Sequence, residues 1–200
     1  MKRRRCKPEG SWGFTLVELL LALSLGTLLF AVLLRLIGAD LQLGRAMALR
    51  LSESSRQRRS LELIREELGW AHGWVVDPPV SEDWPCRMRG RRPVLAVATL
   101  ADDLQASGES AIVYSVGSAP SAIWRGQVLM RCGPAYSLDG VPNLRGVFQN
   151  RVLLDALPHD IGSGFTARPH PQWPVLELEI EQQLPSRSGE PQVLRSRLAA

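Results

Sequence analysis

The sequence Gly13-Phe14-Thr15-Leu16-Val17-Glu18 opens the stretch that decides the fold, and an apolar run follows it directly. Residues 14–34 make a segment of 21 residues in which Glu18 alone is charged. As a helix rising about 1.5 Å per residue, this segment would be about 30 Å long, the thickness of a bilayer core. A carboxylate inside such a segment costs about 2.5–3.5 kcal/mol on insertion scales, so Glu18 is expected to have a function. The alternative is an ordinary signal anchor with Glu18 at the membrane interface.

The order of basic leader, Gly13, Phe-Thr-Leu-Val-Glu and apolar helix resembles the class III signal of type IV pilins and type II secretion pseudopilins. The resemblance implies that a prepilin peptidase cuts between Gly13 and Phe14 on the cytoplasmic side and N-methylates Phe14. Glu18, which we expect to be unpaired in lipid before assembly, would then pair with the N-terminal amine of a neighbouring subunit. Such a pair would set the register of a filament, because misplaced subunits leave both charges unpaired.

The basic character of the chain comes from its leader. In residues 1–13, five lysines and arginines stand against Glu9, and the resulting charge of +4 equals the formal net charge of all 200 residues. The remainder is neutral overall, so the composition does not indicate nucleic-acid binding. Because positive flanking residues stay cytoplasmic, we expect the N-terminus inside and residues 70–200 in the periplasm, in a single-pass protein of the bacterial inner membrane. The family resemblance adds a later location in a pilus or pseudopilus.

The helical pattern continues past the membrane segment. Apolar residues recur with the spacing of an amphipathic helix at Leu36, Leu43, Met47, Leu51, Leu61, Ile64 and Leu68. Residues 52–59 are polar, and the apolar stripe is weakest there. No proline occurs between residues 12 and 77, so we predict one helix over residues 14–69 with Gly69 as its C-terminal cap. Its last three stripe residues are expected to pack under a sheet.

Residues 70–200 are predicted to form a β-rich head. Strand-like composition marks residues 94–100, 111–116, 122–131, 175–184 and 192–198. Residues 152–157 fit a short helix or a strand, residues 70–76 indicate an apolar exit from the helix, and residues 160–174 indicate a surface loop. In the last hairpin, Glu177 and Glu179 are expected opposite Arg195 and Arg197. The predicted fold is α+β: a long N-terminal helix, half membrane and half amphipathic, packed on a small, mainly antiparallel sheet.

The cysteines indicate a disulfide in the head. Cys6 lies in the leader, which leaves Cys86 and Cys132. An even number in an oxidising compartment favours a bond between them, and the alternative is two separate buried thiols. A metal site is not expected, because the sequence has no CxxC motif, its three histidines lack ligand spacing, and it has no sufficient acidic cluster for calcium.

Four arginines, Arg87, Arg89, Arg91 and Arg92, form a basic cluster that fits either a solvated loop or a contact with a partner subunit or DNA. The sequence contains no phosphate-binding glycine loop and no HExxH or GxSxG motif, so we predict neither an enzyme nor a cofactor. The layout resembles minor pilins of the W type and the J-type minor pseudopilin. This implies a minor structural subunit whose partners are prepilin peptidase, other pilin or pseudopilin subunits and the inner membrane. The alternative is a membrane-anchored periplasmic binding or sensor domain that does not polymerise.

Overall fold

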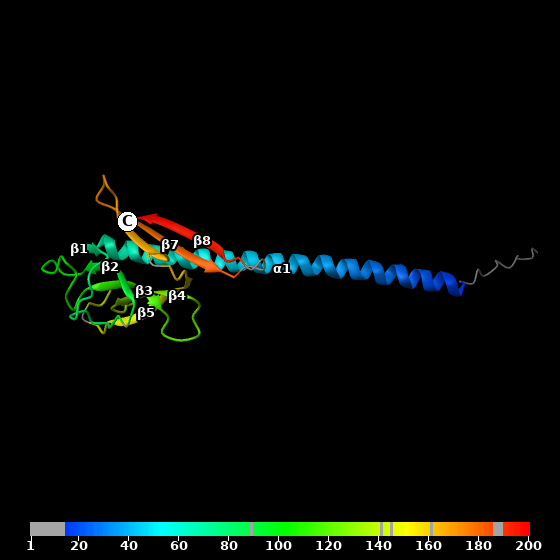
Figure 1. Cartoon of the computed structure of the whole chain (residues 1–200), viewed down its shortest axis with the longest axis horizontal. Helices are drawn as coiled ribbons and strands as arrows, with labels where there is room; N and C mark the ends of the chain where they lie inside the picture. Colours follow the sequence, from blue (N-terminus) through cyan, green and yellow to red (C-terminus); the bar gives the residue numbers. More distant parts are fainter. Residues whose placement is uncertain (1–14, 89, 141, 145, 161, 186–189) are drawn as a thin grey trace, which may run out of the picture. The chain divides into compact units, whose positions relative to one another are not determined.

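The computed structural model describes residues 15–88, 90–140, 142–144, 146–160, 162–185 and 190–200 (Figure 1). In this part of the chain it has one helix and eight strands: α1 (Leu16–Gly69), β1 (Gly73–Val76), β2 (Arg92–Ala98), β3 (Ile112–Ser118), β4 (Gln127–Gly133), β5 (Gln149–Leu157), β6 (Phe165–Pro169), β7 (Leu176–Leu184) and β8 (Gln192–Ala199). The fold is α+β, as predicted. The chain divides into two compact units, one ending at Leu49 and one comprising Arg50–Ala200, and each is described by itself.

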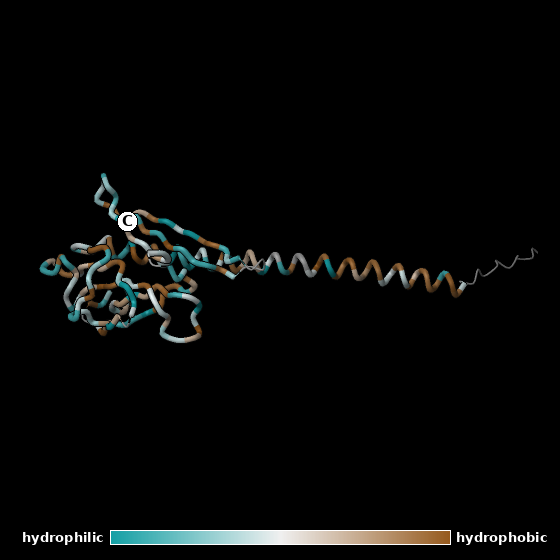
Figure 2. The backbone as a smooth tube through the Cα atoms, viewed as in Figure 1, coloured by the Kyte–Doolittle hydropathy of each residue, from teal (hydrophilic) through white to brown (hydrophobic). Residues whose placement is uncertain are grey.

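In the first unit, α1 presents apolar side chains to its surroundings. The segment Leu16–Gly38 is long and apolar enough to cross a membrane, and its side chains are exposed. In Figure 2 the tube along this part of α1 is mostly brown, the colour of hydrophobic residues. The expectation of a helix that is long enough to serve as a single-pass anchor is therefore met, and its described part starts two residues after Phe14.

In the second unit, β1 to β5 form an antiparallel meander in sequence order. Two of the three inner strands, β2 and β3, are rich in β-branched and small apolar residues, and nearly all of their side chains are buried. The hairpin from β3 to β4 was expected, but β4 begins at Gln127, and residues 119–126 form its connection. Gly126 has φ 59°, a conformation that ends the loop and favours glycine.

Two segments of this sheet differ from the sequence-based expectation. The apolar exit at residues 70–76 contains the short strand β1, which pairs with β2 from Gly73 opposite Ala98. Four residues are too few to show a clear alternating pattern in the sequence. The strand is defined by its pairing with β2. The ambiguous segment 152–157 is part of the nine-residue strand β5, which pairs with β4.

The last three strands, β6, β7 and β8, form a second antiparallel sheet. The prediction of a surface loop over residues 160–174 is wrong where β6 lies. Phe165 and Ala167 are buried, with more exposed residues between and after them, but flanking glycines and prolines hid this short alternation. The hairpin of β7 and β8 was expected, and the turn predicted between them lies largely outside the described residues.

The register of that hairpin corrects the predicted charge pairs. Glu179 lies opposite Arg197, as expected for one pair. Glu177, however, lies opposite Ala199, and Glu181 takes the place opposite Arg195. Both charge pairs belong to this one register, and Arg195 Nε lies 2.8 Å from Glu181 Oε2.

The core joins the second half of α1 to both sheets. Leu61 and Ile64 are almost fully buried, and Leu68 packs on the same cluster, so the predicted packing of this stripe is confirmed. From the sheets the cluster includes Leu95, Val97, Ile112, Tyr114, Leu129, Leu154, Phe165, Leu176, Leu178 and Ile180. One apolar core thus holds the helix, the meander and the three-stranded sheet of the second unit together.

Candidate functional site

The first candidate site is the start of α1. Gly13 and Phe14, the predicted cleavage and methylation residues, lie outside the described residues. Glu18 lies in the first turn of α1, where its Oε2 accepts hydrogen bonds from the backbone N and the Oγ1 of Thr15, both at 2.9 Å. Thr15 Oγ1 also accepts from the Glu18 backbone N at 3.3 Å.

This reciprocal arrangement is a capping box, with Thr15 as N-cap and Glu18 three residues later. The expectation that the Glu18 carboxylate has no opposite charge to pair with before assembly stays a prediction. The carboxylate is exposed, and the donors that it has among the described residues are two neutral groups of Thr15. It can therefore still accept a hydrogen bond from a charged donor, because an ionised carboxyl has about four acceptor positions.

A second set of polar residues connects the C-terminal part of α1 to the rest of the second unit. Glu67 is fully buried in α1 and accepts from three side chains. Its Oε1 accepts from Arg131 Nε at 2.8 Å and from the hydroxyl of Tyr136, and its Oε2 accepts from the hydroxyl of Tyr114. Arg131 Nη1 donates to the carbonyl of Pro134 at 3.0 Å. We call these four side chains, Glu67, Tyr114, Arg131 and Tyr136, the Glu67 cluster.

The electrostatics of the Glu67 cluster follow from its burial. Burial, with the charge and hydrogen bond of Glu67, raises the pKa of Tyr114 well above its usual value. Burial and the hydrogen bond to Glu67 also raise the pKa of Tyr136. Burial disfavours the charged form of Arg131, but the hydrogen bond and charge of Glu67 outweigh it and raise the pKa of Arg131. The cluster is therefore a buried ion pair with two neutral phenols.

Two further polar contacts lie closer to the middle of α1. Arg125 donates to Asp155 in β5 at 3.2 Å and to Glu53 in α1 at 3.3 Å. The hydrogen bond and charge of Asp155, with Glu53, raise the pKa of Arg125. Gln57, with no exposed surface, donates to Gln182 in β7 at 2.9 Å.

Gln57 also contacts β8, where its Oε1 accepts from Ser196 at 2.6 Å. With Glu53 and Glu67, it gives α1 three buried polar positions that bind the sheets or, through Arg125, the connection of β3 and β4. These contacts were not predicted from the sequence. Glu53, Gln57, Ile64 and Glu67 follow one another at helical spacings of three, four and seven, so the signal was present as polar residues on the same face as Ile64.

The predicted disulfide between Cys86 and Cys132 is present, with the Cα atoms 5.9 Å apart. Cys132 lies in β4, directly after Arg131, and Cys86 lies in the loop between β1 and β2. Trp84, Cys86 and Met88 form a small cluster with residues of the sheet, and Trp84 Nε1 donates to the carbonyl of Ala106 at 2.9 Å. The bond therefore fixes a covering loop on the sheet.

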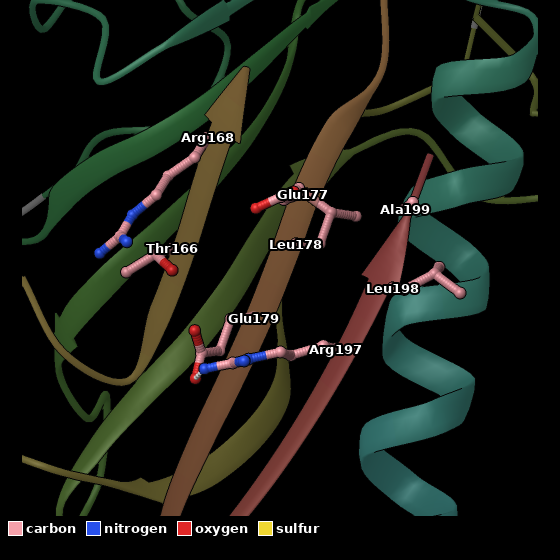
Figure 3. A pocket seen from close by; sticks show the side chains of 8 residues that line it. All are labelled: Thr166, Arg168, Glu177, Leu178, Glu179, Arg197, Leu198 and Ala199. Carbon is pink, nitrogen blue, oxygen red and sulfur yellow. Dashed lines mark hydrogen bonds and ion pairs between the residues drawn. The ribbon is translucent and has the colours of Figure 1, made fainter. Parts of the chain in front are cut away.

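A shallow groove of about 430 Å³ lies on the three-stranded sheet (Figure 3). Two arginines and two glutamates line it: Arg168, Arg197, Glu177 and Glu179. Arg197 and Glu179 point toward one another, with Nη2–Oε1 3.1 Å. The opposite charges balance, so the groove favours neither an anion nor a cation.

Within the described residues, no three His, Cys, Asp or Glu side chains lie close enough together to hold a metal ion. The predicted absence of enzymatic activity and of a cofactor stays a prediction. No family model, curated protein or solved structure matches this chain. Its function is therefore argued from its own residues.

Proposed function

We propose that this chain is a minor structural subunit, a minor pilin or pseudopilin, of a type IV pilus or a type II secretion filament. The junction at residues 13–18 carries the proposal, because a basic leader, Gly13 and Phe14 precede an exposed apolar helix of membrane-spanning length that has Glu18 in its first turn. An anchor needs only length and hydrophobicity, and neither requirement explains a carboxylate in the first turn.

In the proposed mechanism, a prepilin peptidase cleaves between Gly13 and Phe14. The lack of a side chain at Gly13 allows close approach of the protease to the backbone. The new amine on Phe14 of one subunit then reaches Glu18 of its neighbour. A charged ammonium is a stronger donor than the neutral Thr15 groups that hold Glu18 now, so the exchange favours the assembled register.

The head would follow the helix into the filament. Gln57 and Glu67 contact the two sheets through buried hydrogen bonds, and Glu53 binds Arg125 in the connection of β3 and β4, so this half of α1 and the sheets form one unit. Packing of neighbouring helices would then place the head surfaces in a defined arrangement. The proposal makes the head the part that contacts other minor subunits or a cargo.

One observation favours the second candidate, an anchored periplasmic binding or sensor domain that does not polymerise. The capping box of Thr15 and Glu18 is complete within a single chain. Such a box stabilises a helix start by about 1 kcal/mol without any partner, which gives Glu18 a purely local purpose.

The experiment compares Glu18→Ala with Thr15→Ala in protein purified from its native membrane and from sheared filaments. Both substitutions break the capping box, but only Glu18→Ala removes the carboxylate. We expect mature chains that begin with N-methyl-Phe14, and filament incorporation that is lost in Glu18→Ala and retained in Thr15→Ala. An intact Met1, or equal incorporation of both variants, would overturn the assembly mechanism and favour the anchored domain.

A further inference from the structure

The face of the five-stranded sheet that points away from α1 is covered only in part. Side chains that alternate with the core residues, Ala96, Ala98 and Val113, are covered by the disulfide-bonded loop through Trp84 and Met88. Beside this covered part lies a groove of about 780 Å³. We call it the arginine groove, and the residues used below are Arg87, Arg91, Trp124, Met130, Phe148 and Val152.

The arginine groove has an apolar floor. Met130 of β4 is buried, and Phe148, directly before β5, and Val152, within β5, are half-buried. Trp124, from the connection of β3 and β4, forms part of the wall. Covering apolar surface contributes about 25 cal/mol per Å², so this floor favours an apolar side chain of a ligand.

The opposite wall is held in place by the disulfide. Arg87 follows Cys86 directly, and its backbone carbonyl accepts from Arg91 Nη2 at 3.0 Å. Asn150 Nδ2 of β5 lies 3.5 Å from the same carbonyl oxygen. These contacts fix the backbone at Arg87 while its side chain remains exposed. A wall that is rigid before binding loses little conformational entropy when a ligand binds.

The charge of the arginine groove has one sign. Arg87 and Arg91 both line it, and none of its described lining residues is acidic. A guanidinium pairs best with a carboxylate, which it binds through two parallel hydrogen bonds. Nucleic acid fits less well, because its affinity grows with the number of phosphates that cations neutralise, and the described lining offers two arginines.

We propose that the arginine groove binds an acidic peptide segment of a neighbouring subunit. A carboxylate of that segment pairs with Arg87, and a large apolar side chain packs between Phe148 and Trp124. The inference rests on the proposed function only in taking the partner to be a subunit of the same filament. It assigns a binding role to Arg87, one of the four arginines in the basic cluster.

The test uses the full chain in detergent micelles and a displayed library of random peptides. We expect enriched peptides that combine Asp or Glu with Trp, Phe or Leu. Their binding should weaken about tenfold or more in Arg87→Glu, since a charge attraction becomes a repulsion. The matched control is Arg151→Glu, which makes the same charge change at an exposed position of β5 between Asn150 and Val152, whose side chains face the groove. Replacing the acidic residue of a selected peptide by Lys should restore binding to Arg87→Glu.

Three results would overturn the inference: no enrichment over empty micelles, equal binding to wild type and Arg87→Glu, or equal loss in both variants. Concentration-dependent self-association in ultracentrifugation, lost in Arg87→Glu and kept in Arg151→Glu, would assign the groove to a second copy instead. The intact mass of the same preparation separates this test from the proposed function. If the chain starts at Phe14 and binds no peptide, the groove inference alone is overturned. If the leader is intact and the chain binds peptide, the proposed filament function alone is overturned.

Discussion

The substitution Glu67→Gln tests whether buried polar contacts hold α1 in place. Glutamine has nearly the same size. Its one side-chain oxygen, in the position of Oε1, accepts from the hydroxyl of Tyr136, while its NH2 group, in the position of Oε2, donates to the hydroxyl of Tyr114. It removes the negative charge that faces Arg131, whose side chain is only 3% exposed. The change therefore leaves a buried guanidinium without its counter-ion while the packing of the core stays intact.

The expected magnitude follows from this burial. Removing one partner of a buried ion pair destabilises a protein by about 3–5 kcal/mol, because the remaining charge is desolvated and unpaired. Arg131 keeps its hydrogen bond to the carbonyl of Pro134 and a neutral amide oxygen in place of the carboxylate, but none of the contacts named above then supplies a negative charge. With a urea dependence of about 2 kcal/mol per molar, the unfolding midpoint should fall by about 1.5–2.5 M.

The assay is urea unfolding of the full chain in a mild detergent, followed by tryptophan fluorescence. Trp84 is buried in the head and reports on its unfolding. The double variant Glu67→Gln/Arg131→Met removes both charges, and we expect it to be more stable than Glu67→Gln by at least about 1 kcal/mol. A midpoint of Glu67→Gln within about 0.5 M of wild type, or a double variant less stable than the single one, would refute the reasoning.

Two further predictions concern the head. Reduction of Cys86–Cys132, which closes a loop across a sequence separation of 46 residues, should lower the free energy of unfolding by about 4 kcal/mol, measured by urea unfolding with and without reductant. A Cys86→Ser/Cys132→Ser variant that matches the oxidised protein in stability would contradict this. The raised pKa of Tyr114 and of Tyr136 predicts a loss of stability at high pH. Above about pH 10 the unfolded chain releases phenolic protons that the folded protein keeps, so stability falls by up to about 1.4 kcal/mol per pH unit for each tyrosine. The variant Tyr114→Phe should show a shallower decline between pH 10 and 11, and an identical decline would contradict the assignment.

Those parts of the fold that follow from long periodic patterns could be predicted from the sequence. The helix α1 (Leu16–Gly69) combines an uninterrupted apolar run with a stripe through Leu61, Ile64 and Leu68, and no proline interrupts it. The strand β7 alternates strictly between apolar and acidic residues over residues 176–181. Each pattern arises because one face of a single helix or strand is buried, so it can be recognised from residues that are close together in the sequence.

The parts that the sequence did not predict depend on partners far away in the chain. The strand β6 has five residues and is defined by pairing with β7, which its flanking glycines and prolines do not reveal. The Glu67 cluster joins residues up to 69 positions apart, and nothing local distinguishes Glu67 from an exposed glutamate. The arginine groove similarly combines a loop, a hairpin connection and two strands.

The polar face of α1 also explains why an apolar stripe alone would not define this head. Leu61 and Ile64 contribute burial, but apolar contacts tolerate small shifts of a helix along a sheet. Glu53, Gln57 and Glu67 each require a particular partner, at Arg125, at Gln182 and Ser196, and at Arg131. A slip by one residue would leave buried charges and amides without hydrogen bonds, at a cost of about 1–3 kcal/mol or more for each group. In a subunit whose helix packs in a filament, this penalty would keep every head in the same position on its helix.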